Sequence, residues 1–247
     1  MAQTKIIYGL HAVNAALQRH PENVLTVYCV DKADKMFADC VGQADNFGIF
    51  VQYCKPLALD KIANSTHHQG IAAQIRQKEI LDQKAIERYL ENPPTVPLIL
   101  ILEGLQDPHN LGACLRSAEA LGVDWVVMPK NKTAPLNATV SKVACGADQY
   151  LAIAEVPNIV RFIQQIQSQG VWVVGTSDKA SITIQSASLT RPLALVMGPE
   201  GEGLKRLTLE VCDEVVKIPL RGSTSSLNVS VATGICLYEC LRMRSQD

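Results

Sequence analysis

The stretch I-P-L-R-G-S-T-S-S-L-N-V-S-V-A-T-G, residues 218–234, decides how the second half of the chain is interpreted. It leaves an apolar strand, passes four consecutive hydroxyl side chains at 223–226, and becomes strongly apolar after Asn228. An ordinary surface loop is polar, but it does not lead into so hydrophobic a helix. Ser226 and Asn228 can simply cap that helix, and a nucleophilic serine is disfavoured because the G-x-S-x-G elbow is missing. The loop is therefore either a helix cap or the wall of a ligand site.

The helix that follows is predicted over 228–243, and its apolar surface is wide. Its apolar side chains recur at helical spacing at Val229, Ala232, Cys236, Leu237, Cys240 and Leu241, broadened by Val231 and Ile235. So much apolar surface on one helix predicts that the helix is fully buried or lies in a subunit interface.

Upstream of this stretch, short apolar strands alternate with helices. The expected strands are 98–103, 123–128, 171–175, 193–197 and 214–220, and the expected helices are 110–121, 138–146, 158–168 and 203–211. This alternation predicts an α/β domain over 97–247, with a parallel sheet covered by helices on both faces. Ligands of such sheets bind beyond the carboxyl ends of the strands, so a site is expected in the loops there.

The chain begins with a smaller alternating unit over 1–76. Its expected helices are 11–18, 33–46 and 57–64, and its expected strands are 24–30, 48–53 and 70–75. Residues 77–96 are charged and then rich in proline, and Pro93 and Pro94 do not continue a helix. They predict a linker between the two domains, with room for one helical segment.

A second candidate loop, residues 103–122, follows the first strand of the larger domain. Asn110 is a good N-cap, and Gly122 is a good residue just beyond the helix end. The apolar residues at helical spacing are Leu111, Cys114, Leu115, Ala118 and Leu121, which form the expected buried face. Gly112 and Arg116 share another face, where the glycine permits a close approach beneath the guanidinium. Taken alone, Arg116 is equally well explained as a solvated helix residue.

The third candidate loop is L-V-M-G-P-E-G-E-G-L-K-R, residues 195–206. Its glycines let backbone N–H groups approach a ligand. A phosphate-binding P-loop would require lysine at Leu204 and serine or threonine at Lys205, and Glu200 and Glu202 would repel a triphosphate. The loop suits a cationic or hydroxyl-rich ligand, unless it is an ordinary turn whose glutamates favour a helix N-terminus.

Three segments together resemble a known family. N-L-G-A-C-L-R (110–116), L-V-M-G-P-E-G-E-G-L (195–204) and the opening stretch are similar, in this order and spacing, to the three motifs of the SpoU/TrmH branch of the SPOUT RNA 2′-O-methyltransferases. Three other segments, 7–13, 68–73 and 136–147, resemble the bacterial members that methylate a guanosine ribose in 23S rRNA. The resemblance covers essentially the whole chain.

This resemblance implies S-adenosylmethionine as the methyl donor and 23S rRNA as the partner. It implies a deep trefoil knot in the C-terminal domain, which general rules of chain topology would not predict, and a homodimer formed through that domain. The N-terminal domain is implied to be an RNA-binding unit similar to ribosomal protein L30e.

The resemblance also implies site residues. The positions implied for the donor site are Thr176, Gly198, Gly203, Ile218 and Leu227, and those implied for catalysis are Asn110, Arg116, Glu200, Ser226 and Asn228. The family assigns activation of the ribose hydroxyl to Arg116, but a guanidinium is effectively always protonated. Arg116 is therefore either the proton acceptor or a group that orients a phosphate and stabilises the developing alkoxide. Arg221 departs from the smaller residues expected in its loop.

Two alternatives remain open at this stage. A tRNA ribose methyltransferase is the first, although the separate N-terminal domain and the match at 68–73 favour rRNA. A non-catalytic RNA-binding or ribosome-assembly protein is the second, although it would predict decay of the motif residues, all of which are present. A dehydrogenase or an NTPase is disfavoured because the nucleotide fingerprints are missing.

The composition of the chain supports further expectations about RNA binding, location and metal binding. The net charge of −1 requires that RNA affinity come from local patches, for which the candidates are Arg19, Lys32, Lys35, Lys55, Lys61 and Lys142. The sequence contains no secretory signal and no apolar run of membrane-spanning length, which predicts a cytoplasmic protein without membrane contact. Eight cysteines without a C-x-x-C pair, and scattered histidines, predict that no metal is bound.

Overall fold

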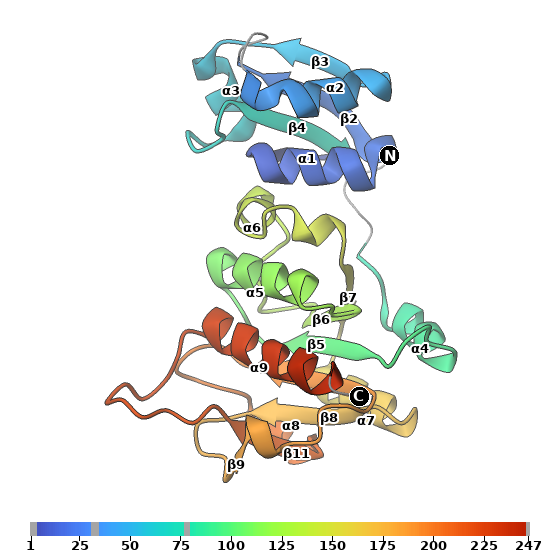
Figure 1. Ribbon diagram of the computed structural model, residues 1–247, viewed down its shortest axis with the longest axis vertical. Helices are drawn as coiled ribbons and strands as arrows, with labels where there is room; N and C mark the ends of the chain where they lie inside the picture. Colours follow the sequence, from blue (N-terminus) through green and yellow to red (C-terminus); the bar gives the residue numbers. More distant parts are fainter. Residues whose placement is uncertain (1–3, 31–34, 77–79, 246–247) are drawn as a thin grey trace. The chain divides into compact units, whose positions relative to one another are not determined.

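The computed structural model describes residues 4–30, 35–76 and 80–245 (Figure 1). The chain divides into two compact units, one made of residues 1–79 and 135–150 and the other of residues 80–134 and 151–247. The first unit therefore contains two separate pieces of the sequence.

A four-stranded sheet with the order β1-β4-β2-β3 organises the first unit. Its strands are β1 (Thr4–Tyr8), β2 (Val24–Cys29), β3 (Phe50–Tyr53) and β4 (Ile71–Arg76), and its helices include α1 (Leu10–Arg19), α2 (Ala38–Asn46) and α3 (Pro56–Ala63). β4 is antiparallel to β1 and β2, whereas β2 and β3 are parallel. The predicted helices and strands of this unit are present within a few residues. The prediction missed β1, which is held by its pairing with a strand more than sixty residues away.

The segment 135–150 belongs to this unit, although the sequence pattern placed it in the larger domain. Helix α6 (Ala138–Val143) packs against β1. Gly146 lies so close to α1 that a Cβ there would come within 2.4 Å of the Cβ of Ala15. The buried carboxylate of Asp148 accepts hydrogen bonds from Ser141 Oγ at 2.7 Å and Lys5 Nζ at 3.4 Å. These contacts attach the segment to the N-terminal sheet.

The second unit is built on a seven-stranded sheet with the order β7-β6-β5-β10-β8-β11-β9, in which every described pair is parallel. Its strands are β5 (Leu98–Leu102), β6 (Trp125–Pro129), β7 (Ala152–Val156), β8 (Trp172–Thr176), β9 (Ile182–Thr183), β10 (Leu193–Met197) and β11 (Glu214–Lys217). The predicted α/β domain with a parallel sheet is confirmed. β7 was missed, because its short sequence A-I-A-E-V has no continuous apolar run.

Helices cover both faces of this sheet. They are α4 (Gln83–Glu91), α5 (Pro108–Ala120), α7 (Ile159–Ser168), α8 (Arg206–Val211) and α9 (Val229–Arg244). Ile99 and Ile101 of β5 pack with α4 and α7 in one core. The alternate residues Leu98, Leu100 and Leu102 are also at most 2% exposed, so the opposite face is covered as well. α9 runs along α5 (Figure 1).

The described part of the predicted linker is folded onto the second unit. Asp82 caps α4 by accepting from the backbone N–H of Ala85, and Ile86 is completely buried. Tyr89 lies with its ring centroid 5.8 Å from that of Trp125. Residues 77–79 lie outside the described residues. The prediction of a linker allowed for a helix here but not for its packing, because the strongly one-sided apolar face of α4 has a partner only in the folded sheet.

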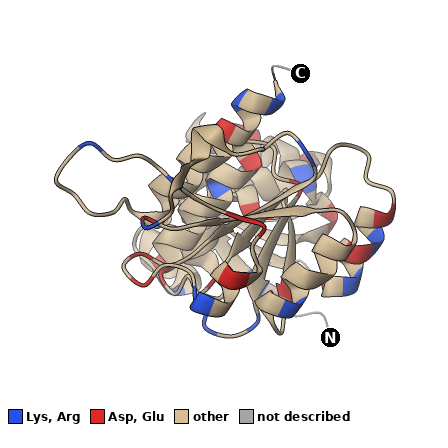
Figure 2. Ribbon diagram, turned by 90° about the horizontal axis from the view of Figure 1, so that it is seen from below, with Lys and Arg blue, Asp and Glu red and all other residues tan. Residues whose placement is uncertain are grey.

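Charge is distributed without a dominant sign. Figure 2 shows Lys and Arg interspersed with Asp and Glu along the ribbon. Of the predicted basic patch, Arg19, Lys55, Lys61 and Lys142 belong to the first unit, where Lys142 lies over the ring of Tyr8 at 5.5 Å. Lys32 and the side chain of Lys35 lie outside the described residues.

Two findings on the described residues concern membrane spans and metal sites. Within residues 4–30, 35–76 and 80–245, no helix is both long and apolar enough to cross a membrane. Among the same residues, no group of three or more His, Cys, Asp and Glu side chains is arranged to hold a metal ion.

Candidate functional site

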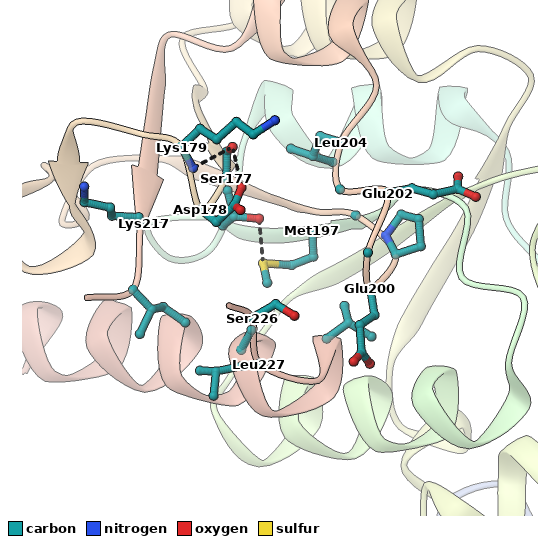
Figure 3. Close-up of a pocket in the computed structure, with 18 of the residues that line it drawn as sticks. Ser177, Asp178, Lys179, Met197, Glu200, Glu202, Leu204, Lys217, Ser226 and Leu227 are labelled. Atoms are coloured by element: carbon teal, nitrogen blue, oxygen red, sulfur yellow. Dashed lines mark hydrogen bonds between the residues drawn. The ribbon is translucent and has the colours of Figure 1, made fainter. Parts of the chain in front are cut away.

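The loops after β8, β10 and β11 enclose a cavity of about 390 Å³ at the carboxyl ends of these strands (Figure 3). β10 and β11 both pair with β8, which brings loops far apart in the sequence to one edge of the sheet. The apolar part of the lining includes Met197, Leu204, Leu209, Val216, Ile218, Leu227, Val229 and Ala232. A mainly apolar cavity of this size, with a few polar groups, is typical of a small-molecule site.

All five residues predicted for the donor site line this cavity, namely Thr176, Gly198, Gly203, Ile218 and Leu227. Two residues predicted for catalysis, Glu200 and Ser226, line it too. In Figure 3, Glu200, Ser226 and Leu227 lie on the side of the cavity next to the helices, and Lys179 lies on the other side. Asn110, Arg116 and Asn228 are not part of the lining.

The loop after β10 folds back tightly on itself. A Cβ on Gly198 would lie 2.5 Å from the carbonyl carbon of Gly203 and 2.6 Å from the backbone nitrogen of Leu204. The N–H of Gly203 donates to the carbonyl of Pro199 at 3.0 Å, with Gly203 at a φ of 67°. This left-handed conformation ends the loop before the helix, so the predicted helix 203–211 begins only at Arg206.

Three predicted residues from the three loops meet in a hydrogen-bonded cluster. Asn228 Nδ2 donates to Asn110 Oδ1 at 2.9 Å and to Glu200 Oε2 at 3.2 Å. Asn228 Oδ1 accepts from the backbone N–H of Ser230 at 2.9 Å, which caps α9 as predicted. Asn228 therefore joins α9 to the other two loops.

The N-cap of α5 was wrongly predicted. Asp107, rather than Asn110, caps this helix by accepting from the N–H groups of His109 and Asn110 at 3.0 and 3.3 Å. The helix starts at Pro108, two residues before its predicted start, because proline suits the first helical position. Asn110 is thereby free to use its side-chain oxygen in the cluster with Asn228.

Arg116 lies apart from the cavity. It is exposed on α5, one turn and a half beyond Asn110, and no hydrogen bond or ion pair within the described part of the chain engages its guanidinium. Because Arg116 lies apart from the cavity, its positive charge is accessible to a molecule other than this chain.

Several residues of the lining were not singled out from the sequence. Ser177, Asp178 and Lys179 follow β8, and Lys217 and Leu220 flank Ile218. Ligands bind beyond the carboxyl ends of the strands, so the last residue of each strand and the three residues after it were the positions to inspect. Cys236 also lines the cavity, and burial raises the pKa of its thiol to about 12. This cysteine is therefore a neutral, apolar part of the wall rather than a thiolate nucleophile.

An open groove runs between α5 and α9. It is lined by Ala113, Ser117, Ser230, Val231, Gly234, Ile235 and Tyr238. Val231 is 50% exposed and Tyr238 59% exposed, although the stripe of α9 that faces the core, including Cys236 and Leu237, is completely buried. The wide apolar surface predicted for this helix thus covers two faces, one in the core and one in solvent.

Comparisons with known proteins match both parts of the chain. A profile of the SpoU rRNA Methylase family matches residues 97–238, and one described as RNA 2'-O ribose methyltransferase substrate binding matches residues 6–81. The chain is 46% identical over 241 residues to the 23S rRNA (guanosine-2'-O-)-methyltransferase RlmB of Vibrio parahaemolyticus, which covers 97% of each chain.

Solved structures have the same fold over nearly the full length. A crystal structure of an RNA 2'-O ribose methyltransferase superposes with a TM-score of 0.84 at 27% identity, covering 99% of this chain and 90% of that one. The SpoU methyltransferase AviRb from Streptomyces viridochromogenes, crystallised with AdoMet, superposes with a TM-score of 0.82 at 21% identity, covering 99% and 92%.

Proposed function

The chain belongs to the SpoU rRNA methylase family, and we propose from this membership that it transfers the methyl group of S-adenosylmethionine to the 2′-oxygen of a guanosine ribose in 23S rRNA. The observation that carries the proposal is the convergence of all three motifs in one place. Asn110, Glu200 and Asn228 are hydrogen-bonded together beside a cavity that is lined by the loop at 195–206 and by the stretch at 218–234.

The cavity fits the proposed donor in its chemistry. Its apolar wall, which includes Ile218 and Leu227, suits the adenine ring. The carboxylates of Asp178 and Glu200 at its edge suit a ligand with a cationic sulfonium, an ammonium group and a ribose diol better than a triphosphate. When bound, S-adenosylmethionine supplies an electrophilic methyl group. The chain's own residues have to hold the ribose 2′-OH in line with that methyl group and assist the loss of its proton.

We assign Arg116 to the RNA side of the reaction. Its exposed guanidinium lies outside the donor cavity and has no partner among the described residues, so it is available to an RNA phosphate or to the reacting oxygen. Because a guanidinium stays protonated in water, electrostatic stabilisation of the developing alkoxide is favoured over proton abstraction. Ser226, which lines the cavity, is proposed to lie between donor and substrate.

The cluster around Asn228 is proposed to hold the three loops in the arrangement that catalysis requires. Asn228→Asp separates this function from helix capping, because aspartate caps a helix as well as asparagine does but has no N–H to donate. The variant is expected to keep its thermal unfolding midpoint within about 3 °C. Its methyl transfer is expected to fall at least about tenfold. The new carboxylate, the side-chain oxygen of Asn110 and the carboxylate of Glu200 would then face one another as three acceptors.

Asn228→Ser is the matched variant, since serine also caps but brings no charge next to Glu200. Comparing the two by differential scanning calorimetry and by single-turnover methyl transfer separates lost donation from added repulsion. Full activity in both variants would contradict the proposed role of the cluster.

We extend the proposal to the parts of the family pattern that concern chain topology and location. The second unit is proposed to be threaded as a deep trefoil knot, and the first unit to be an RNA-binding domain similar to ribosomal protein L30e. Support comes from the full-length superposition on an RNA 2'-O ribose methyltransferase. The protein is proposed to act in the cytoplasm, where its rRNA substrate is made.

A homodimer through the second unit is also proposed. The groove between α5 and α9 exposes apolar side chains that a second copy would cover, and Arg116 lies on α5 beside it. Tyr238→Asp is expected to weaken self-association by at least about 30-fold, because a charge would replace a large, exposed aromatic side chain of the proposed interface. Sedimentation velocity at micromolar concentration measures this change.

Leu207→Asp is the matched control for the dimer prediction. Leu207 is 56% exposed and lies on α8, outside the groove. If Tyr238→Asp and wild type sediment identically, or if Leu207→Asp dissociates the protein equally well, the surface between α5 and α9 is not the interface.

A methyl-transfer assay tests the proposed function directly. Purified protein and labelled S-adenosylmethionine are incubated with rRNA or tRNA from a strain that lacks the gene. Methylation of one ribose in 23S rRNA is the expected result. Transfer to tRNA would keep the chemistry and overturn the substrate, whereas RNA binding without transfer to either would favour a non-catalytic protein of the same fold.

A further inference from the structure

A buried carboxylate that the proposed mechanism does not use contacts the chain at both ends of the loop 198–204. Glu103 follows the last residue of β5, and it is only 3% exposed. An ionised carboxylate in the interior is unfavourable unless hydrogen bonds or charges compensate it. Among the described residues, Glu103 is hydrogen-bonded to the last residue of β10 (Met197), to the residue before α8 (Lys205) and to a residue of α8 (Thr208).

Glu103 contacts both ends of the loop that follows β10. Its backbone N–H donates to the carbonyl of Met197, the last residue of β10, at 2.9 Å. Its Oε2 accepts from the backbone N–H of Lys205 at 3.2 Å. Its Oε1 accepts from the buried hydroxyl of Thr208 at 3.0 Å and from Lys205 Nζ at 3.3 Å. One residue thus joins the start of the loop to its end.

The loop between these two ends forms part of the wall of the cavity. Every residue from Gly198 to Leu204 lines the cavity. Because the loop has no secondary structure of its own, its shape depends on the close packing of Gly198 against Gly203 and on the separation of its ends. Glu103 sets that separation from outside the cavity.

The backbone anchor matters more than the ion pair. The Lys205 side chain is 66% exposed, and exposed ammonium groups contribute little to a pair because water screens them. The N–H of Lys205 is the first donor of α8 that the helix itself does not satisfy. Without Glu103, this N–H would lose its acceptor inside the protein.

We propose that Glu103 is a positioning residue for the donor site, which shapes the Gly198–Leu204 loop by accepting from the N–H of Lys205 and the hydroxyl of Thr208. This inference rests on the proposed function, because it takes S-adenosylmethionine as the ligand of the cavity. Glu103 acts through the loop and does not touch the donor.

Three variants test the inference. Glu103→Met removes the acceptors and keeps a similar side-chain volume. Glu103→Gln keeps one carbonyl oxygen for the N–H of Lys205, and its amide can donate to the Thr208 hydroxyl, so it is the conservative rescue. Lys205→Met removes only the exposed ammonium. For each, the Kd for S-adenosylmethionine is measured by titration calorimetry, and KM for donor, KM for RNA and kcat are measured by methyl transfer.

Glu103→Met is expected to raise the Kd and KM for S-adenosylmethionine about tenfold, since the buried hydroxyl of Thr208 and the N–H of Lys205 would both lose their acceptor. The KM for RNA should stay unchanged. Glu103→Gln and Lys205→Met should stay within about threefold of wild type. A merely structural role would instead reduce the folded, active fraction and so lower the apparent kcat without changing the Kd of the folded protein.

The outcomes separate the inference from the function it rests on. If wild type binds no S-adenosylmethionine, the proposed function fails first. If wild type binds and transfers methyl groups but Glu103→Met has an unchanged Kd, the inference alone is overturned. If Lys205→Met is as impaired as Glu103→Met, the ion pair rather than the backbone anchor shapes the loop, and the inference is overturned in the form stated.

Discussion

Arg116→Ala is expected to lower the single-turnover rate of methyl transfer by about 10²–10³-fold, the effect of removing one group that stabilises charge in a transition state. The Kd for S-adenosylmethionine should be unchanged, because Arg116 does not line the donor cavity. Quenched-flow or manual single-turnover assays with 23S rRNA fragments measure the rate, and titration calorimetry measures donor binding. A loss of rate without a loss of donor binding would place Arg116 in the chemical step.

Two further arginine variants serve as comparisons for this prediction. Arg161→Ala removes an equally exposed helix arginine from α7, far along the chain from the three motifs, and should leave the rate unchanged. Arg116→Lys retains the charge but loses the planar fork that binds phosphate at two points, so a partial loss is expected. Unimpaired transfer by Arg116→Ala would remove this residue from the mechanism.

Gly198→Ala is expected to weaken binding of S-adenosylmethionine by about 10–100-fold. The new Cβ would lie 2.5 Å from the carbonyl carbon of Gly203 and 2.6 Å from the nitrogen of Leu204, and real side chains do not occupy such positions. Both neighbours are backbone atoms, so no side chain can rotate away. Overpacking of this kind typically costs about 1–3 kcal/mol, which the loop can relieve only by opening the cavity that it lines.

Gly222→Ala is the control for this prediction. Gly222 lies in the loop before α9 and is not among the glycines at positive φ, and a Cβ there would meet no described atom within 4 Å beyond its chain neighbours. Its variant should bind the donor like wild type. Equal Kd values for Gly198→Ala and wild type would mean that the loop after β10 does not shape the donor site.

Most of the local structure follows from the sequence because it depends on short-range patterns. The apolar runs at 98–102 and 193–197 form central strands, and Asn228 caps α9. One error arose where two local cues were nearly equal. Asp107 and Asn110 are both good caps, and the proline between them selected the earlier one.

The five donor-site residues could be proposed from the resemblance to the family, and all of them line the cavity. The connections behind that cavity could not. Nothing near Glu103 in the sequence indicates that its carboxylate would meet Lys205 and Thr208, about a hundred residues later. Such contacts depend on which strands become neighbours, and periodicity does not specify that.

The sequence by itself determined the parallel α/β sheet, the edge at which a ligand would bind and the three loops that meet there. Only the tertiary structure decided that 135–150 belongs to the N-terminal unit, that α4 is packed rather than a free linker, and that Arg116 is separate from the donor cavity. The physical reason is the range of the forces involved. Backbone geometry and burial patterns act within a few residues, whereas strand order, buried charge pairing and domain membership are decided by contacts between segments far apart in the chain.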